Sequence, residues 1–292
     1  MAIAVTGATG KLGSLVIEAL LRRVPAGFIT AVARDSAKAT PLADRGVRVH
    51  IADYDEPGTF RDAFAPGDRV LLISSDSAGA RHTFQHTTVI GAAKAAEVEL
   101  LAYTSVLAAP AATYSIGRDH HATEEAVRRA GVPYAFLRNG WYNENYTGHL
   151  DAILEVGQVF GSAGPGRIAA AARADYAEAA AVILTGPVEP DAIYELSGDS
   201  AFTLADLADE ISRQTGRPIA SPHLTPAEYH AFMVGQGVDA ADATQLVEAD
   251  SAISRGELAH ANGDLRRLLG RATTPIADSV AAALAAIGSV AR

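Results

Sequence analysis

The chain has 292 residues, of which 49% are apolar, and this is ample for a sizeable buried core. Its 24 Lys and Arg against 34 Asp and Glu give a formal net charge of -10, which argues against broad electrostatic binding to nucleic acid or to an anionic membrane. The chain has no cysteine, which excludes disulfides, thiolate catalysis and cysteine-ligated metal or iron–sulfur sites. No basic region precedes the first apolar run and no run approaches membrane-spanning length, so we expect a cytoplasmic protein.

Short apolar runs alternate with helical patterns through the first half of the chain. The expected strands are residues 2–5, 29–33, 47–52, 70–73, 100–103 and 134–137, and the expected helices are 12–21, 83–96 and 120–130. This alternation predicts an α/β fold in which crossover helices join the strands of a Rossmann-type, doubly wound parallel sheet. Ligands of such sheets lie beyond the carboxyl ends of the strands, so the residues that follow each strand are the first candidates for a site.

The pattern changes in the second half of the chain. A helix over 175–184, with Asp175 as its N-cap, and a strand over 193–196 are expected to return to the sheet. Helices then dominate, and their starts are marked by Thr203, by a capping box from Thr225 to Glu228, and by Thr274 before a proline. We predict a sheet domain over 1–150, with 171–198 returning to it, and a smaller, mostly helical C-terminal lobe over 199–292. The Ala-rich stretches 168–174 and 280–286 are expected to be packed.

The first expected strand runs into a Gly-x-x-Gly-x-x-Gly turn and then into a helix. Gly7 allows a sharp turn after the strand, Gly10 allows the backbone to approach a pyrophosphate, and Gly13 allows the helix to pack closely on the sheet. The start of the helix offers unpaired N–H groups and the positive end of the helix dipole to phosphates. The sequence therefore predicts a dinucleotide site whose turn consists of Gly7, Ala8, Thr9, Gly10, Lys11, Leu12 and Gly13.

The end of the second expected strand indicates which nucleotide is preferred. Many NAD-binding domains place an acid there to bond the ribose 2′-hydroxyl, but this chain has Arg34. A guanidinium pairs bidentately with a 2′-phosphate, and Lys38 adds a second positive charge one helical turn later. We therefore predict a preference for NADP(H). The alternative is that Arg34 is only a solvated surface side chain and that the neighbouring Asp35 bonds the ribose.

Polar residues also follow the later strands. Asp53 and Tyr54 are expected near the adenine, Ser74 and Ser75 beside the cofactor ribose, and Thr104 and Ser105 near the nicotinamide, although each pair also suits a simple turn. The segment after the sixth strand holds the only Trp among polar and aromatic neighbours. Its candidates are Asn139 and Gly140 on the cofactor side, and Trp141, Tyr142 and Asn143 on the substrate side. For Trp141, a purely structural role, in which its ring packs between the two lobes, is an equal alternative to substrate binding.

Histidines offer further candidates. Classical short-chain dehydrogenases pair a Tyr acid with a Lys four residues later, and this pairing is missing here, since alignment on Glu124 places His120 where the Lys would stand. His120 or its neighbour His121 is therefore a candidate contact for cofactor or substrate, with a surface role as the alternative. His82 and His86 have a spacing that suits zinc, but no third ligand lies nearby in the sequence, so we expect no metal.

The glycine turn, Ala33-Arg34, Ala52-Asp53-Tyr54, Ser74-Ser75, Thr104-Ser105, the segment from Arg138 to Tyr142 and Arg173-Ala174-Asp175-Tyr176 together resemble the NmrA-like atypical short-chain dehydrogenases. The resemblance adds Arg173 to the cofactor contacts. It implies NADPH in a cleft between two lobes and a quinone that accepts hydride directly, without flavin or metal. A homodimer is compatible with it. Because some relatives are catalytically silent NAD(P)-binding redox sensors, a regulatory protein is the alternative function.

Overall fold

The computed structural model describes residues 2–290, and the chain divides into two compact units. The first unit contains residues 2–110, 116–139 and 174–195, and the second contains 111–115, 140–173 and 196–290. Each unit is therefore assembled from segments that are far apart in the sequence.

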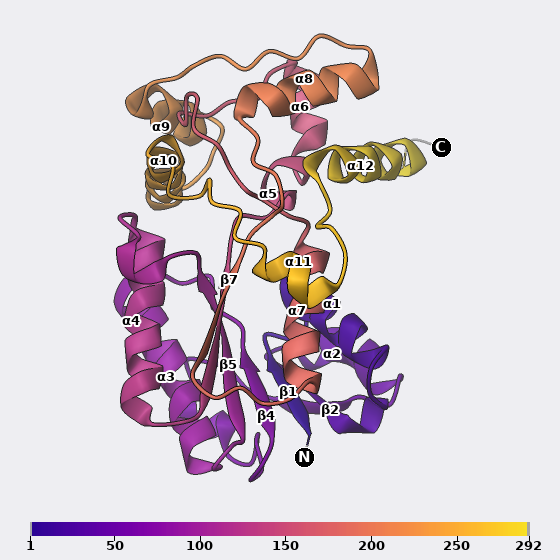
Figure 1. Cartoon of the computed structure of the whole chain (residues 1–292), viewed down its shortest axis with the longest axis vertical. Helices are drawn as coiled ribbons and strands as arrows, with labels where there is room; N and C mark the ends of the chain where they lie inside the picture. Colours follow the sequence, from indigo (N-terminus) through magenta and orange to yellow (C-terminus); the bar gives the residue numbers. More distant parts are fainter. Residues whose placement is uncertain (1, 291–292) are drawn as a thin grey trace. The chain divides into compact units, whose positions relative to one another are not determined.

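The first unit contains a seven-stranded sheet with helices on both faces. Its strands are β1 (Ile3–Thr6), β2 (Ile29–Ala33), β3 (Arg48–Ile51), β4 (Arg69–Leu72), β5 (Leu100–Val106), β6 (Tyr134–Asn139) and β7 (Ala192–Leu196). Its helices are α1 (Lys11–Leu21), α2 (Ser36–Ala43), α3 (Gly79–Ala95), α4 (Ser115–Ala130) and α7 (Arg173–Thr185), with short 3-10 turns η1 (Ala26–Phe28), η2 (Pro57–Phe60) and η3 (Ala109–Ala111). Figure 1 shows α3 and α4 on one face of the sheet and α1, α2 and α7 on the other.

The strand order β3-β2-β1-β4-β5-β6-β7 reverses direction at β1. Pairing is parallel between β1 and both of its neighbours, and likewise between β2 and β3, β4 and β5, and β5 and β6. In β1, Val5 lies opposite Ala31 of β2 and Leu71 of β4. This is the predicted doubly wound arrangement, and it places the switch point, where such sheets bind ligands, at the glycine turn after β1.

The central strands are hydrophobic on both faces, as expected for strands covered by helices. All residues of β1 and β4 are buried, and Leu101, Tyr103 and Phe136 are buried in the cluster that packs under α3 and α4. The strand ends differ from prediction by a few residues. The largest difference is β5, which extends to Val106 because Thr104, Ser105 and Val106 pair with β6.

The second unit is mostly helical. Its helices are α5 (Glu144–Thr147), α6 (Leu150–Val156), α8 (Leu204–Thr215), α9 (Pro226–Gly235), α10 (Ala240–Ser254), α11 (Asp264–Leu269) and α12 (Ile276–Val290). The capping box predicted at Thr225 is present, and Thr203, predicted only as a helix cap, also forms a capping box with Asp206. Residues 140–150, which the sequence pattern placed with the sheet domain, lie in this unit together with 151–173. The segment forms isolated parallel bridges within the unit, Tyr142 to Ala171 and Gly161 to His223.

Two helix caps differ from expectation. The helix predicted to begin after Asp175 begins at Arg173, so Asp175 is not its N-cap. The carboxylate of Glu144 accepts the Arg173 N–H at 3.0 and 2.9 Å, a contact across 29 residues that local sequence does not reveal. Asp35, the alternative ribose contact, caps α2, because one of its carboxylate oxygens accepts the N–H groups of Ala37 and Lys38.

The two Ala-rich stretches also differ from each other. In the first stretch Ile168 to Ala172 are all buried, as expected, whereas Arg173 is half-buried and Ala174 is exposed. In the second stretch Val280 is buried, whereas Ala281, Ala282, Ala285 and Ala286 are exposed on α12, so that stretch is only partly packed.

Among residues 2–290, no helix is long and apolar enough to cross a membrane.

Candidate cofactor site

The glycine turn is sterically demanding. Gly7 has a φ of 61°, a left-handed conformation that favours glycine. A Cβ atom at Gly13 would lie 2.2 Å from the Gly7 carbonyl oxygen and 2.8 Å from the Ala8 Cα atom. A Cβ at Gly10 would lie 3.2 Å from the same carbonyl. Two of the three glycines are thus fixed by backbone conformation or by the close approach of α1 to β1, which are the roles that the sequence predicted.

The turn leaves main-chain donors for an anion. Ala8 N–H donates to the Val32 carbonyl at 3.2 Å, and Gly10 N–H donates to the Gly7 carbonyl at 2.9 Å, so these two amides are committed. Helix α1 begins at Lys11 with Gly10 as its N-cap, without a side-chain cap and without an acid in the first turn. The first amides of a helix have no intrahelical acceptor, so those of Lys11, Leu12 and Gly13 remain to bind phosphate. Leu12 itself is buried and contributes only its backbone.

Arg34 follows β2 directly and extends into solvent. Its side chain is 75% exposed, and its Nε lies 4.0 Å from an Asp53 carboxylate oxygen, which is the outer limit of an ion pair. The guanidinium is therefore only loosely held and is accessible to a phosphate. Lys38 is exposed in the first turn of α2, the helix that follows Arg34.

Tyr54, which the sequence placed near adenine, packs against the glycine turn after β1. Its hydroxyl donates to the Ile73 carbonyl at 2.9 Å and also contacts Thr6 Oγ1. Burial raises the pKa of this phenol well above its ordinary value. Gly7 lies against the same group, since a Cβ there would be 3.6 Å from the Ile73 Cβ and 3.8 Å from the Tyr54 hydroxyl. The structure thus brings the ends of β1 and β4 together.

In the segment after β4, the backbone amides of Ser74 and Ser75 are both hydrogen-bonded to side chains. Ser74 N–H donates to Thr104 Oγ1 at 2.9 Å, and Ser75 N–H donates to His86 Nε2 at 3.0 Å. Within the described residues, the buried Ser75 hydroxyl oxygen has no hydrogen-bond partner. A buried polar atom without a partner is costly, so a ligand hydroxyl at this place would be favourable.

Ser105 belongs to a buried ionic network. Its hydroxyl donates to Glu124 Oε1 at 2.7 Å. Arg138 makes two bonds to Glu124, at 2.8 and 2.6 Å, and a third to Glu195 at 2.7 Å. Burial alone would lower the pKa of Arg138, but its bonds to the two glutamates raise it overall. The sequence pattern served to align Glu124 but did not reveal this network.

His120 lies inside α4 instead of near a helix start, because the helix begins at Ser115, five residues earlier than predicted. It is 7% exposed, and its Nδ1 lies 2.7 Å from the Tyr103 hydroxyl. Burial is the main cause that lowers its pKa, to about 3. His82 and His86 of α3 lie close by, with ring centroids of His82 and His120 5.5 Å apart. This group of three buried histidines, each with a lowered pKa, was not predicted, although the spacing of His82 and His86 placed them on one helix face.

The remaining candidates form a group within the second unit, except Asn139, which is buried at the end of β6 in the first. The Arg173 guanidinium lies over the Tyr142 ring at 4.8 Å, a cation–π contact. The Asn143 side chain is fully buried and donates to the Thr274 carbonyl at 3.1 Å and to Ser279 Oγ at 2.9 Å. Asn143 therefore ties this segment to the start of α12, whereas Trp141 and Tyr142 are partly exposed.

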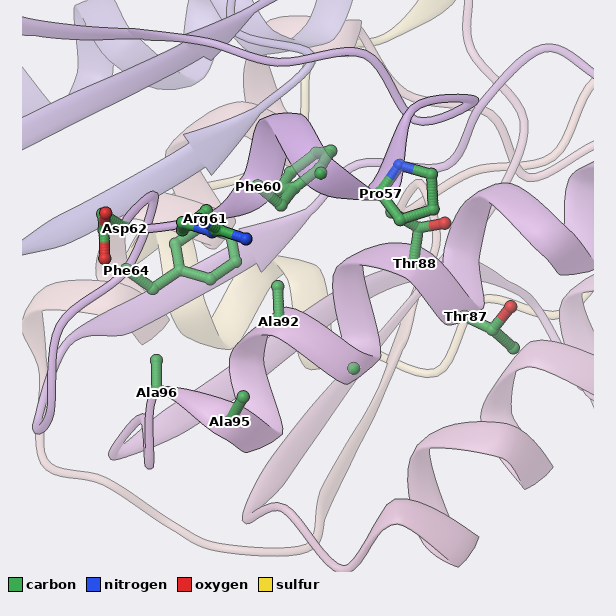
Figure 2. A pocket seen from close by; sticks show the side chains of 12 residues that line it. Pro57, Phe60, Arg61, Asp62, Phe64, Thr87, Thr88, Ala92, Ala95 and Ala96 are labelled. Carbon is green, nitrogen blue, oxygen red and sulfur yellow. The ribbon is translucent and has the colours of Figure 1, made fainter.

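A cavity of about 750 Å³ lies in the first unit, between η2 with the residues after it and the outer side of α3 (Figure 2). It is lined by Pro57, Gly58, Phe60, Arg61, Asp62, Phe64, Thr87, Thr88, Gly91, Ala92, Ala95 and Ala96. None of these is a predicted site residue, so we assign the cavity no part in cofactor binding.

The residues of the first unit fit a dinucleotide phosphate. The glycine cradle and the free amides of α1 suit a pyrophosphate, and the exposed Arg34 guanidinium suits a 2′-phosphate. The Ser75 hydroxyl, which has no partner among residues 2–290, suits a ribose. Among residues 2–290, no group of three or more acidic or histidine side chains is arranged to hold a metal ion.

Comparisons with known proteins agree with this geometry. Residues 1–253 match the model of the NmrA-like family. The chain is 42% identical over 278 residues to Quinone oxidoreductase 2 of Escherichia coli, covering 95% of this chain and 97% of that one. The crystal structure of the NADPH-dependent quinone oxidoreductase of Escherichia coli complexed with NADPH superposes with a TM-score of 0.92, at 42% identity, over 96% and 98% of the two chains. The Citrobacter sp. triphenylmethane reductase complexed with NADP(H) has 36% identity and a TM-score of 0.92, over 97% and 100%.

Proposed function

The chain belongs to the NmrA-like family, and on that premise we propose that it is an NADPH-dependent oxidoreductase that reduces quinones by direct hydride transfer. The observation that carries the proposal is the cradle of Gly7, Gly10 and Gly13 at the uncapped start of α1, with Arg34 at the end of the adjacent strand. This arrangement suits a pyrophosphate and a 2′-phosphate on one molecule.

The chain's own residues bind and orient the cofactor. The amides of Lys11, Leu12 and Gly13 hold the pyrophosphate, and Arg34 and Lys38 pair with the 2′-phosphate. Asp53, Ser74, Ser75, Thr104, Ser105, Asn139, Gly140 and Arg173 are the further cofactor contacts that we propose. When bound, NADPH supplies a hydride from C4 of its nicotinamide ring.

The quinone requires little acid catalysis from the protein. A hydride brings two electrons and one proton, and the product is a hydroquinone anion whose charge is stabilised as a phenolate, so a water molecule can supply the second proton. The missing Tyr-Lys pair, which alcohol chemistry would need, is therefore not an obstacle. Trp141 and Tyr142 are the side chains that we propose as a wall for the quinone ring.

The test is consumption of NADPH by the purified protein in the presence of benzoquinone, followed by the absorbance of the reduced nicotinamide. We expect turnover with both substrates present and none when either is omitted. Cofactor binding in calorimetry without consumption would reject the reductase and favour the regulatory alternative, which also predicts a protein partner in stoichiometric amount. The relatives named above are oxidoreductases, which supports the reductase.

We also propose a homodimer and a cytoplasmic location. A homodimer predicts twice the chain mass in light scattering, and a cytoplasmic location predicts recovery in the cytosolic fraction of cells.

A further inference from the structure

The strongest unexplained feature is a chain of hydrogen bonds that begins beneath the segment after β4. Ser75 N–H donates to Nε2 of His86, which lies in the second turn of α3 and is fully buried. Nδ1 of His86 lies 3.0 Å from Thr123 Oγ1 on α4, and the Thr123 hydroxyl donates to the Asp119 carbonyl at 3.1 Å. These hydrogen bonds link the end of β4 to α3 and α4, the helices that cover it.

The protonation state of His86 follows from these partners. A backbone amide only donates, so Nε2 must accept and carry no proton. A neutral imidazole then has its proton on Nδ1, which donates to Thr123 Oγ1. Thr123 uses its own proton for the Asp119 carbonyl, so every bond in the chain has a fixed direction. A second proton on His86 would face the Ser75 N–H and break the contact.

The surroundings of His86 oppose that second proton. The His82 ring on the same helix is 3.9 Å away between centroids. Burial, then His82 and His120, hold the pKa of His86 well below its ordinary value. The titratable or polar groups that face His86 from the other elements are Tyr54 after β3, Tyr103 on β5, and Thr123 and His120 on α4. The charged Asp119 acts on His82 and Tyr103, and the charged Glu124 acts on Tyr103.

We propose that neutral His86 is a positioning residue for the cofactor. By accepting the Ser75 amide, His86 fixes the segment whose Ser75 hydroxyl has no partner among residues 2–290, and so holds that hydroxyl ready for the nucleotide. This inference rests on the proposed NADPH-binding function. A histidine that only filled space would affect stability without affecting affinity for the nucleotide.

The test replaces His86 in two ways. His86→Leu removes the acceptor, leaves the Ser75 amide unpaired, and should raise the Kd for NADPH and its KM about tenfold. The kcat at saturating NADPH should change by less than about twofold, because the segment binds the cofactor but moves no atom in the reaction. In His86→Gln the amide oxygen again accepts from Ser75, so most of the affinity should return.

The pH profile gives a second readout. Because the pKa of His86 lies well below its ordinary value, His86 stays neutral near neutral pH, and NADPH binding by the natural protein and by His86→Gln should depend on pH in the same way there. The 2′-phosphate titrates equally in both, so the difference between the two calorimetric profiles isolates His86. A component near neutral pH that the natural protein has and His86→Gln lacks would overturn the neutral acceptor. If His86→Leu fails to fold, Ser75→Ala decides, since it removes the hydroxyl and keeps the backbone amide bonded to His86, and an unchanged Kd for NADPH would overturn the proposal.

Val89→Ala is the matched control. Val89 is fully buried one turn further along α3 and packs in the hydrophobic core. The variant should lower the melting temperature while leaving the Kd for NADPH unchanged. Equal shifts in Kd for Val89→Ala and His86→Leu, or no shift in His86→Leu, would reject the role of His86. If the natural protein itself does not bind NADPH, the proposed function fails as well, so the two failures are distinguishable.

Discussion

A Cβ atom at Gly13 would lie 2.2 Å from the carbonyl oxygen of Gly7, closer than any two such atoms can approach. The first turn of α1 therefore lies directly on the turn that precedes it. Any side chain at position 13 must push the helix away from the strand, and with it the amides that are expected to hold the pyrophosphate.

Gly13→Ala should consequently lower both stability and cofactor affinity. The clash is with backbone, which yields poorly, and we expect a loss of about 1–3 kcal/mol in the free energy of unfolding. Gly91→Ala on α3 is the control, since a Cβ there meets nothing within 4 Å. In a helix that change should stabilise by about 0.5–1 kcal/mol. Urea unfolding and calorimetry with NADPH measure both effects; a Gly13→Ala protein that binds NADPH normally would contradict this geometry.

Arg34→Ala should change the choice of nucleotide. Loss of a charge-assisted contact to the 2′-phosphate costs about 2 kcal/mol, so the KM for NADPH should rise about thirtyfold while that for NADH changes little. Arg45→Ala serves as the comparison, because Arg45 is occupied by Glu18 at the surface. Steady-state kinetics with both nucleotides measures the ratio. Equal effects of Arg34→Ala on NADPH and NADH would refute the assignment.

Glu124→Ala should be the most destabilising of these single changes. Glu124 is fully buried, and its removal leaves Arg138, whose side chain is 9% exposed, with Glu195 as its one anionic partner among the described residues. Breaking a buried pair from one side typically costs about 3–5 kcal/mol. Glu18→Ala, in a pair with both side chains nearly half exposed, should cost less than about 1 kcal/mol. Chemical denaturation of the two variants would show the contrast; similar losses would mean that the buried network is not structural.

Trp141→Ala separates a binding role from a packing role. If the indole is a wall for the quinone, the KM for benzoquinone should rise by about tenfold or more while the melting temperature changes little. A lower melting temperature with unchanged kinetics would identify Trp141 as a packing residue. Phe28→Ala, at a side chain that is 54% exposed, should change neither quantity.

The three buried histidines predict a loss of stability in acid. Burial lowers the pKa of His82, His86 and His120 in the folded state, that of His120 to about 3. The unfolded chain binds these protons below about pH 6.5, so the free energy of unfolding should decrease as pH falls below that value. For His120, whose pKa falls to about 3, the decrease should be about 2 kcal/mol between about pH 7 and pH 5. Urea midpoints across this range measure it, and His86→Gln should have a shallower slope; a flat profile would exclude neutral burial.

The sequence by itself determined the order of the strands, the helices α1, α3, α4 and α7 beside them, the glycine turn and the place of Arg34. These follow from local causes: continuous apolar runs of strand length, the 3.6-residue periodicity of the helices, and the backbone freedom that glycine supplies at the positive φ of Gly7. Only the tertiary structure decided that Glu144 caps α7, that Tyr54 packs against the glycine turn, and that His86 accepts from Ser75. Each of these contacts joins residues that are well separated along the chain, and no short-range pattern encodes which distant side chain reaches a given buried amide.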